Sequence, residues 1–292
     1  MRPAHARVWM AVPLLLSAMA AHAATIEVFP GPGTPLQDAI SSAASGQVIS
    51  IHAGVYTESV VVDRRVRLRT ADEGVVIDAG CTADTALDIA ADDVRVSGIA
   101  NTATALLTIK GGASRTVRVD GRTGVTLKTL NVYGCPGGTG LEISNSSDVK
   151  TKLVHVRDGL VGISVRASTY VKLASSSAQV RQTGLRLEDI APNSPLAGAK
   201  VSVRNGLFHI HDPVTPPERG IHFVAADGVA VKRVDVFGGA GTCIELDANS
   251  DNNRIVHGLL HTTSGGVFLV DGGNGNQILD PYCNNSNLPP CP

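Results

Sequence analysis

The 292-residue sequence predicts an all-β fold, a right-handed parallel β-helix (a solenoid), from three observations. A four-residue pattern, small-apolar-variable-apolar, recurs along the chain, mostly at intervals of 22 or 23 residues. Short alternating segments separated by Gly, Asn, Asp and Ser turns fill each interval. The interval is too short for a helical crossover, because a βαβ unit needs roughly 30 residues. Leucine-rich repeats have a similar length, but their Leu-x-x-Leu-x-Leu spacing is absent.

The recurring pattern places one apolar set of side chains inside each coil and the variable residue outside. Its copies are GLEI (140–143), GISV (162–165), GLRL (184–187), GIHF (220–223), CIEL (243–246) and GVFL (266–269), with ALDI (86–89) and LLTI (106–109) as weaker earlier copies. One such unit cannot bury its own apolar face, whereas stacked coils form a continuous core. We therefore expect one β-helix domain over residues 24–279.

The first 23 residues are typical of a signal peptide. Arg2 and Arg7 precede an apolar stretch over residues 8–20, and Ala21-His22-Ala23 is typical of a cleavage site. We expect cleavage after Ala23, a secreted or periplasmic protein, and no membrane insertion, because the apolar stretch is short for a span. The only tryptophan, Trp9, lies in this segment, so the mature chain would have no tryptophan for sugar stacking.

A short helix near residues 35–45 is predicted to cap the first coil. Thr34 is expected to be the N-cap, Pro35 stands in the first turn, and Gln37 fits the capping box. An apolar stripe with helical spacing follows, formed by Leu36, Ala39, Ile40 and Ala43. At the other end, residues 280–292 are expected to form a disulfide-bonded cap or tail.

In an oxidising compartment, the five cysteines predict one or two disulfides and an odd thiol. They are Cys81, Cys135, Cys243, Cys283 and Cys291. Cys283 with Cys291 is the favoured pair because the two flank a short loop-like segment, and Cys243 with Cys283 is the alternative. No Cys-x-x-Cys or Cys/His spacing indicates a zinc site.

Composition narrows the class of partner. The chain is 43% hydrophobic and 17% charged, with a formal net charge of −1. Long disorder is therefore not expected, and a nucleic acid held by phosphate electrostatics is excluded as the main partner. We expect a monomer.

Three segments carry a resemblance to a known superfamily. LQDAISSAASGQVISIHAGVYTESVVV (36–62), SDNNRIVHG (250–258) and GNQIL (275–279) resemble the opening coil and turns of the pectate-lyase-like β-helix proteins. This resemblance implies a polysaccharide partner, since the superfamily includes pectin and alginate lyases, polygalacturonases, pectin esterases and epimerases. It also includes non-catalytic repeat proteins. Of the polygalacturonase motifs only the paired acids are matched, by Asp92-Asp93, which a turn also explains.

The register of the repeat predicts an outward row of side chains on successive coils, about 4.8 Å apart. Its members are Glu142, Ser164, Arg186, His222, Glu245 and Phe268. Arg186, His222 and Glu245 form the candidate catalytic set. In an enzyme, His222 would be the base or acid, Glu245 would orient it, and Arg186 would neutralise a uronate carboxylate.

Two stretches exceed the repeat length and predict long loops at one corner, where solenoids often bind ligands. They lie within residues 110–124 and 188–219, and the second contains the HIHDP segment. The candidate substrate-binding residues are Glu142, His211, Asp212 and a second row formed by Lys150 and Lys172. If the protein is an enzyme, these residues indicate a polysaccharide lyase or a glycoside hydrolase.

The alternative is a non-catalytic structural or adhesive envelope protein. Arg, His and Glu on an outward sheet face commonly form a solvated cross-strand ladder. The HIHDP segment shows no third ligand, so no metal site is predicted there. GGNGNQIL (272–279) is similar to a calcium-binding nonapeptide, but Asn276 replaces the acid. We therefore expect no cofactor, with calcium as the alternative.

Overall fold

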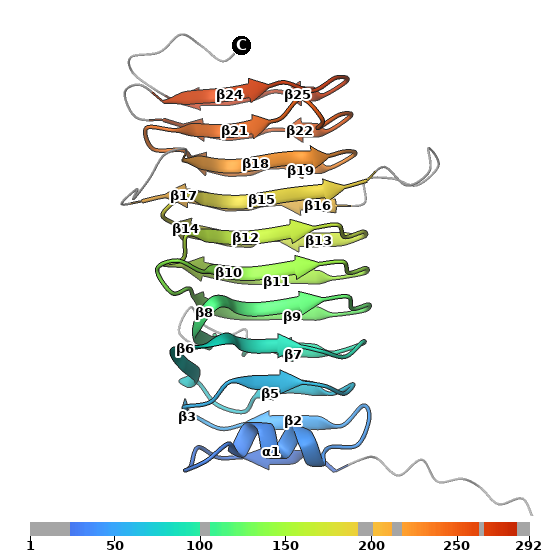
Figure 1. Ribbon diagram of the computed structural model, residues 1–292, viewed down its shortest axis with the longest axis vertical. Coiled ribbons are helices and arrows are strands. Elements are labelled where there is room, and N and C mark those ends of the chain that lie inside the picture. The colour runs from blue at the N-terminus through green and yellow to red at the C-terminus, as the bar shows by residue number, and fades with distance from the viewer. Residues whose placement is uncertain (1–23, 100–105, 192–200, 212–217, 263–265, 285–292) are drawn as a thin grey trace, which may run out of the picture.

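The computed structural model describes residues 24–99, 106–191, 201–211, 218–262 and 266–284. Within these ranges the chain forms a tall stack of coils with one helix, α1 (Pro35–Ser42), at its N-terminal end (Figure 1). All the strand pairs are parallel, and each strand pairs with the equivalent strand of the next coil. The predicted parallel β-helix is confirmed.

Three parallel sheets, named A, B and C, form the sides of the stack. Sheet A contains β4 (Val60–Val62), the ends of β6 (Val75–Ile89) and β8 (Leu107–Asp120), β10 (Thr139–Ser144), β12 (Val161–Arg166), β15 (Thr183–Ile190), β18 (Arg219–Ala226), β21 (Thr242–Leu246) and β24 (Val267–Asp271). Sheet B contains β1 (Ile26–Val28), β2 (Val48–Ile51), β5 (Arg67–Thr70), β7 (Arg95–Ser97), the beginnings of β9 (Thr126–Tyr133) and β11 (Lys150–Arg157), β13 (Val171–Ala174), β16 (Val201–Arg204), β19 (Ala230–Lys232), β22 (Arg254–Val256) and β25 (Gln277–Leu279). Sheet C contains β3 (Gly54–Tyr56), the beginnings of β6 and β8, the ends of β9 and β11, β14 (Ser177–Val180), β17 (Leu207–Ile210), β20 (Asp235–Phe237), β23 (Leu259–His261) and β26 (Tyr282–Asn284).

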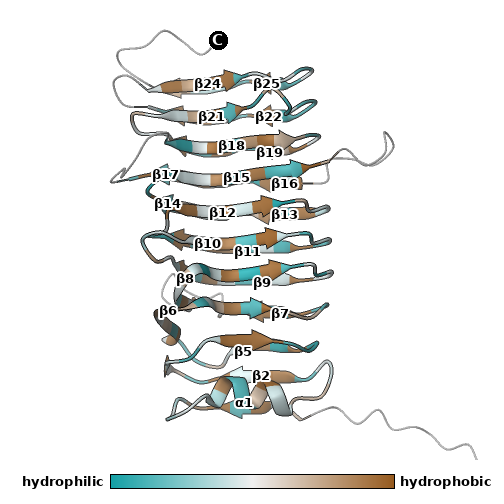
Figure 2. Cartoon of the chain, in the orientation of Figure 1, coloured by the Kyte–Doolittle hydropathy of each residue, from teal (hydrophilic) through white to brown (hydrophobic). Residues whose placement is uncertain are grey.

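The core consists of apolar side chains that stack along the inside of the coils. In sheet A one such inward row is formed by Leu141, Ile163, Leu185, Ile221 and Ile244, which pair in register and are buried. Apolar and polar segments alternate along the strands in Figure 2, as expected when every second side chain points inward. Burial of this row and its neighbours removes apolar surface from water and is the main stabilising term.

The small residue that opens each sheet A repeat is required by close packing between coils. A Cβ atom at Gly162 would lie 2.5 Å from the carbonyl oxygen of Gly184, and one at Gly184 would lie 2.6 Å from that of Gly220. Real Cβ atoms do not approach that closely, so larger side chains would push the coils apart. The glycine positions in the repeat therefore follow from the stacking itself.

Sheets B and C meet at a bend that uses a single residue per coil in the left-handed region. Successive coils place Leu153, Ser175, Asn205, Arg233 and His257 there, with φ between 48° and 56°. None of these is glycine, so each accepts the modest cost of this conformation to turn the chain sharply. The bend recurs at the same place in every one of these coils.

Helix α1 is present, but its N-terminus is capped differently from the prediction. Leu36, Ala39 and Ile40 are buried, as the apolar stripe predicts. The Thr34 side chain makes no capping hydrogen bond. The buried carboxylate of Glu58 instead accepts the backbone N–H groups of Leu36 (3.0 Å) and Gln37 (2.9 Å).

The predicted capping box is therefore wrong, because a carboxylate from the next coil occupies the helix N-terminus. The Gln37 side chain bonds both backbone groups of Val61. Helix α1 packs against β1, β2 and β4. Its role as a protective cap stays a prediction.

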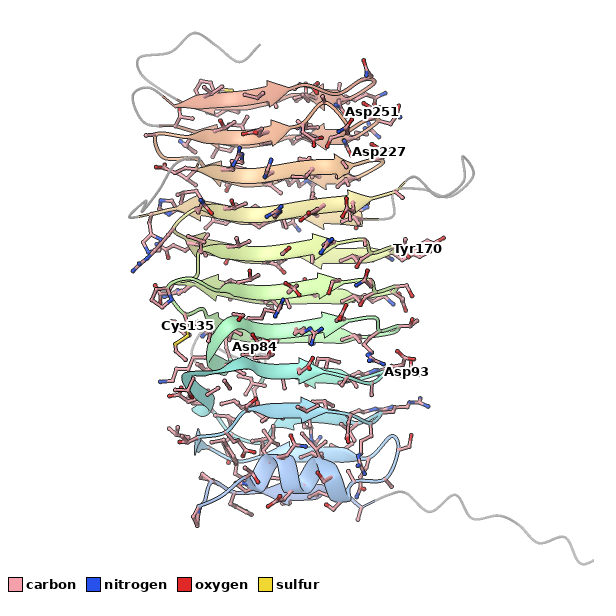
Figure 3. The ribbon with its side chains drawn as sticks, in the orientation of Figure 1. Asp84, Asp93, Cys135, Tyr170, Asp227 and Asp251 are labelled. Carbon is pink, nitrogen blue, oxygen red and sulfur yellow. A yellow bond between two sulfur atoms is a disulfide. The ribbon has the colours of Figure 1, made fainter. Side chains whose placement is uncertain are left out.

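The structure contains a disulfide that sequence spacing did not suggest, between Cys81 and Cys135, 54 residues apart in the chain (Figure 3). Cys243 is a free, buried thiol, so the predicted odd thiol is confirmed and the alternative Cys243–Cys283 pair is wrong. Cys283 is disulfide-bonded. The favoured partner, Cys291, lies outside the described residues.

Two of the predicted repeat boundaries are wrong. Leu107 and Ile109 pair with Leu130 and Val132 in sheet C, so LLTI is not a sheet A copy. Strand β8 continues without a break from sheet C into sheet A and ends at Asp120. The expected loop within residues 110–124 is therefore mostly strand. Part of the second long stretch (188–219) belongs to β15, β16, β17 and β18, and its remainder lies outside the described ranges.

The described residues form no helix long and apolar enough to span a membrane.

Candidate functional site

The outward row of sheet A brings the three predicted catalytic residues together. Arg186 on β15 pairs in register with His222 on β18, and His222 pairs with Glu245 on β21. The three thus occupy successive rungs, about 4.8 Å apart. Glu142 lies on the same row, with Ser164 between it and Arg186.

The row departs from the prediction at its last rung. Val270, not Phe268, pairs with Glu245. Phe268 is buried and belongs to the core cluster, so its predicted outward position is wrong. The final coil is two residues longer than the pattern suggested, so Phe268 takes the register position of Cys243, which is buried in the preceding coil.

The row extends in the other direction through residues that sequence reasoning missed. Glu142 pairs in register with Arg118, and Arg118 pairs with Asp88. Arg118 also binds Asp120 at 2.6 Å, while Arg115 binds Glu142 at 2.8 Å. Much of the charge at this end of sheet A is therefore already paired. The correct assignment of 116–119 as a repeat copy would have revealed this part of the row.

Glu245 is held by an arginine that was not among the predicted residues. Arg219 Nε donates to Glu245 Oε2 at 2.6 Å, and a terminal guanidinium nitrogen donates to Oε1 at 3.1 Å. This two-pronged pair is the strongest geometry available to a carboxylate and fixes its orientation. Arg219 stands three residues before His222 on the same strand and points to the next coil.

His222 is a neutral imidazole at neutral pH. Its side chain is only 16% exposed, and Nε2 lies 3.7 Å from Glu245 Oε1. The pKa of His222 is lowered to about 4, chiefly by burial and also by the nearby charge of Arg219, while Glu245 opposes the shift. A neutral ring offers one donor and one acceptor to a ligand.

The guanidinium of Arg186 is only partly engaged by hydrogen bonds within the described residues. One terminal nitrogen pairs with Glu188 Oε2 at 3.0 Å, and the side chain remains 40% exposed. Its Nε is buried and has no hydrogen-bond partner among the described residues. The exposed part of the guanidinium can donate charge-assisted hydrogen bonds to a ligand oxygen.

The remaining predicted binding residues lie elsewhere. Lys150 and Lys172 do pair in register, but in sheet B, and Lys150 binds Asp148 at 2.8 Å. His211 follows β17 of sheet C, and its buried Nδ1 has no hydrogen-bond partner among the residues that the structure describes. Asp212 lies outside the described residues. Of the described members of this group, only Glu142 shares the row of His222.

Nothing in the described ranges forms a group of three or more His, Cys, Asp or Glu side chains that could hold a metal ion. In the segment 272–279, Asn276 serves the turn itself. Its Oδ1 accepts from Asn253 N at 2.9 Å, and its Nδ2 donates to Ser250 O at 2.8 Å. This asparagine joins two coils.

These groups can hold a ligand that carries acceptor oxygens. The partly exposed guanidinium of Arg186 and the neutral ring of His222 lie side by side in one row, and Glu245 already binds Arg219. As a general base, an imidazole with a pKa of about 4 is weak near neutral pH. The arrangement therefore suits recognition better than proton abstraction.

The fold is shared with proteins that act on or bind polysaccharides. An alginate lyase from Paenibacillus sp. str. FPU-7 is 14% identical with a TM-score of 0.52, covering 87% of this chain and 97% of the lyase. The pectate lyase Pel9A is 10% identical with a TM-score of 0.51, covering 85% and 66% of the two chains. The tailspike of E. coli bacteriophage HK620, in complex with a pentasaccharide, is 13% identical with a TM-score of 0.52, covering 90% and 60%.

No protein-family model matches the chain, and no curated protein matches it by sequence. The protein thus has the parallel β-helix fold of the pectate lyase, alginate lyase and tailspike structures.

Proposed function

We propose that the protein is a secreted polysaccharide-binding β-helix whose sheet A engages an acidic glycan at Arg186, His222 and Glu245. The observation that carries this proposal is the Arg186 guanidinium, which stays 40% exposed although one of its terminal nitrogens pairs with Glu188 Oε2 at 3.0 Å. A uronate carboxylate supplies the matching acceptor with the matching charge.

Each residue has a distinct part in this proposal. Arg186 binds the carboxylate and fixes its position. His222 hydrogen-bonds a sugar hydroxyl, for which a neutral ring is suited because it both donates and accepts. Glu245 is held by Arg219. Its negative charge compensates part of the positive charge of Arg186 and Arg219, and it orients the ring of His222. Glu142 lies two rungs from Arg186 in the same row and contacts a neighbouring sugar.

The structural neighbours support a polysaccharide ligand, since they are an alginate lyase, a pectate lyase and a tailspike in complex with a pentasaccharide. Residues 1–23 are proposed as the export signal. The Cys81–Cys135 disulfide supports export, because disulfides persist in oxidising compartments.

Turnover of the glycan is the second candidate function. The observation that favours it is the adjacency of a guanidinium, a neutral imidazole and a carboxylate on three rungs, the groups that β-elimination or hydrolysis requires. In such an enzyme, His222 moves the proton and Arg186 stabilises the charge on the uronate. The low pKa of His222 predicts slow proton abstraction.

One set of samples tests both functions. The protein is incubated with polygalacturonate, alginate and uncharged dextran, and affinity electrophoresis, unsaturated products and new reducing ends are measured. Arg186→Met is expected to weaken acidic-glycan binding about tenfold, the worth of one charge-assisted hydrogen bond. Arg166→Met is the matched control, since Arg166 is an outward arginine on the adjacent coil, paired with Asp189 at 3.3 Å. Equal effects of the two variants, or no retardation by either polyuronate, would overturn the proposal.

A further inference from the structure

The bend between sheets B and C holds a groove that is separate from the sheet A row. Two cavities, of about 600 and 450 Å³, lie along this bend. Both are lined by Asn205 and Leu207, so they are contiguous. Together they form one groove that runs along the axis of the stack, which we call the bend groove.

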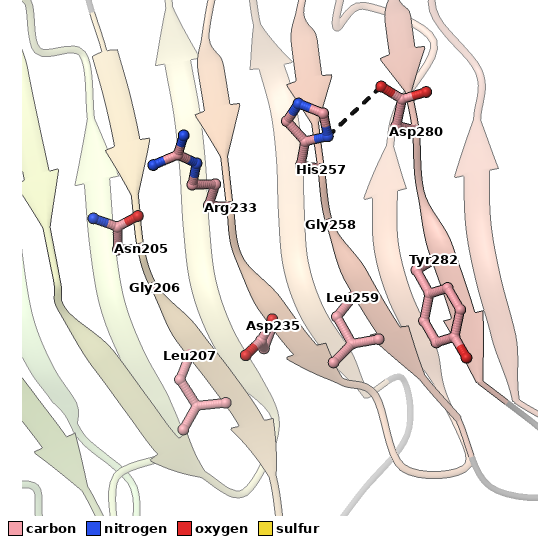
Figure 4. A pocket seen from close by; sticks show the side chains of 10 residues that line it. All are labelled: Asn205, Gly206, Leu207, Arg233, Asp235, His257, Gly258, Leu259, Asp280 and Tyr282. Carbon is pink, nitrogen blue, oxygen red and sulfur yellow. Dashed lines mark ion pairs between the residues drawn. The ribbon is translucent and has the colours of Figure 1, made fainter.

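Two rows of side chains form the walls of the bend groove, as Figure 4 shows for its C-terminal half. One row consists of the left-handed bend residues, including Asn205, Arg233 and His257. The other row is the first outward residue of each sheet C strand, and it runs in register through His155, Ser177, Leu207, Asp235, Leu259 and Tyr282. Six rungs at about 4.8 Å give a length of roughly 24 Å, suited to a linear polymer.

The walls alternate between apolar and hydrogen-bonding groups. Leu207 is 43% exposed and Tyr282 is 66% exposed, so both offer apolar surface to a ligand. Between and beside them lie Asp235 and the His155–Ser177 pair, whose Nδ1 and Oγ are 2.7 Å apart. Sugars have the same alternation, with hydroxyl groups at their edges and C–H groups on their faces, and a tyrosine ring provides both kinds of contact.

The charges of the bend groove nearly balance. Its lining residues include two arginines (Arg157 and Arg233) and two aspartates (Asp235 and Asp280), and Asp280 lies 3.6 Å from the ring of His257. Burial lowers the pKa of His155, so this ring is uncharged at neutral pH. The formal charges of the lining residues thus cancel, and this favours an uncharged ligand over a polyanion.

The strands of the groove exclude one competing occupant, an extended peptide added as a new strand. β17, β20 and β23 are each hydrogen-bonded on both sides by neighbouring coils. A peptide would find no free backbone edge at these three strands and would lose the main-chain bonds that drive strand addition. Recognition in the groove must come from side chains.

We propose that the bend groove is a second carbohydrate site, which binds an uncharged linear polysaccharide along the stack axis. Leu207, Leu259 and Tyr282 contact the C–H faces of successive sugars. Asp235, Asn205 and the His155–Ser177 pair accept and donate hydrogen bonds at the hydroxyl edges. This site is independent of the proposed acidic-glycan site on sheet A.

Affinity electrophoresis with uncharged polymers tests the groove, using hydroxyethylcellulose, galactomannan, xyloglucan and dextran as probes. At least one polymer is expected to retard the protein, and Leu207→Asp is expected to weaken that binding about tenfold by adding a desolvated charge. Val55→Asp is the matched control, because Val55 is a 54% exposed apolar residue on β3 of the same sheet, outside the groove. Arg186→Met is expected to leave this binding unchanged. The proposal for the groove can therefore fail or succeed independently of the proposal for sheet A.

Absence of retardation by every uncharged polymer would overturn the proposal, as would equal losses in Leu207→Asp and Val55→Asp. A second measurement guards against a variant that fails to fold. In the unchanged protein, the bound oligosaccharide is expected to shift the ring NMR signals of Tyr282 and His155 and to leave those of Tyr170 in place. Shifts confined to rings outside the groove would contradict the assignment.

Discussion

His222 Nε2 lies 3.7 Å from Glu245 Oε1 on the adjacent rung of sheet A. This distance is longer than a hydrogen bond, and Arg219 already binds both oxygens of the carboxylate. The imidazole therefore carries the cost of burial without a strong compensating partner. This explains why its pKa falls to about 4 although a carboxylate is close.

The low pKa of His222 predicts a loss of stability in mild acid. Its folded pKa is about 4 and its unfolded value is 6.5, so between these values the unfolded chain binds more protons. The free energy of unfolding should fall as the pH decreases from about 6.5 to about 4, by up to roughly 3 kcal/mol. Urea denaturation at pH 7 and pH 4.5 measures the change. His222→Gln should show a smaller loss, and an identical loss in both proteins would contradict this explanation.

Arg219 is predicted to depress the pKa of His222 through its charge. In Arg219→Met, the guanidinium is removed and Glu245 becomes free to approach the ring, so the pKa of His222 should rise. A pH titration of the ring signals by NMR measures this shift. Arg166→Met, which changes an arginine away from His222 on sheet A, should leave the value unchanged. A pKa that stays near 4 without Arg219 would assign the whole shift to burial.

At the N-terminal end, His52 should produce the opposite pH dependence. Its Nδ1 lies 2.7 Å from Asp72 and its Nε2 lies 2.9 Å from Glu27. The hydrogen bond to Asp72 is the main reason that the pKa of His52 is raised. The stabilising effect is thus fully present below the unfolded value of 6.5 and is lost as the pH rises through the folded value.

Hydrogen exchange of the β1 amides, corrected for intrinsic rates, measures this local effect. Protection of β1 is expected to decrease on raising the pH through the His52 titration, and His52→Gln should remove the dependence. His257→Gln, at the other end of the stack, serves as the control. A pH-independent protection of β1 in the unchanged protein would rule out this role of His52.

The Glu58 carboxylate is predicted to stabilise helix α1. It accepts two backbone N–H groups at the helix N-terminus, where negative charge is also favourable. Glu58→Ala should lower the free energy of unfolding by about 1–2 kcal/mol. Thr34→Ala should cost less than about 0.5 kcal/mol, because the Thr34 side chain makes no capping bond. Equal costs, measured by urea denaturation, would restore Thr34 as the cap.

Periodicity predicted the fold and most of the sheet A row because the rule that creates them is local. In a strand every second side chain points outward, so a repeat of fixed length fixes which residues stack. Arg186, His222 and Glu245 could be aligned from sequence for this reason. The same rule misplaced Phe268, because two extra residues in the last coil shift the register.

The repeat pattern in the sequence did not predict contacts between residues that are far apart in the chain or that lie outside the repeated positions. Arg219 binds Glu245, but it precedes the four-residue repeat GIHF (220–223) and so does not occupy the variable position that the pattern marks as outward. Glu58 caps α1 from the next coil, and Cys81 meets Cys135 only because β6 and the turn after β9 reach the same corner. The bend groove depends on the left-handed residues between sheets B and C, which are not glycines and so are hard to recognise in the sequence.

The most direct test of the sheet A proposal is NMR of the histidine rings during titration with an oligogalacturonate. The sequence has nine histidines, and the proposal predicts that the signals of His222 shift in a saturable way. It also predicts that Arg186→Met abolishes this shift while Arg166→Met preserves it. Saturable shifts of His155 or His209 in the bend groove with no change at His222 would contradict the proposal, as would no shift at any ring.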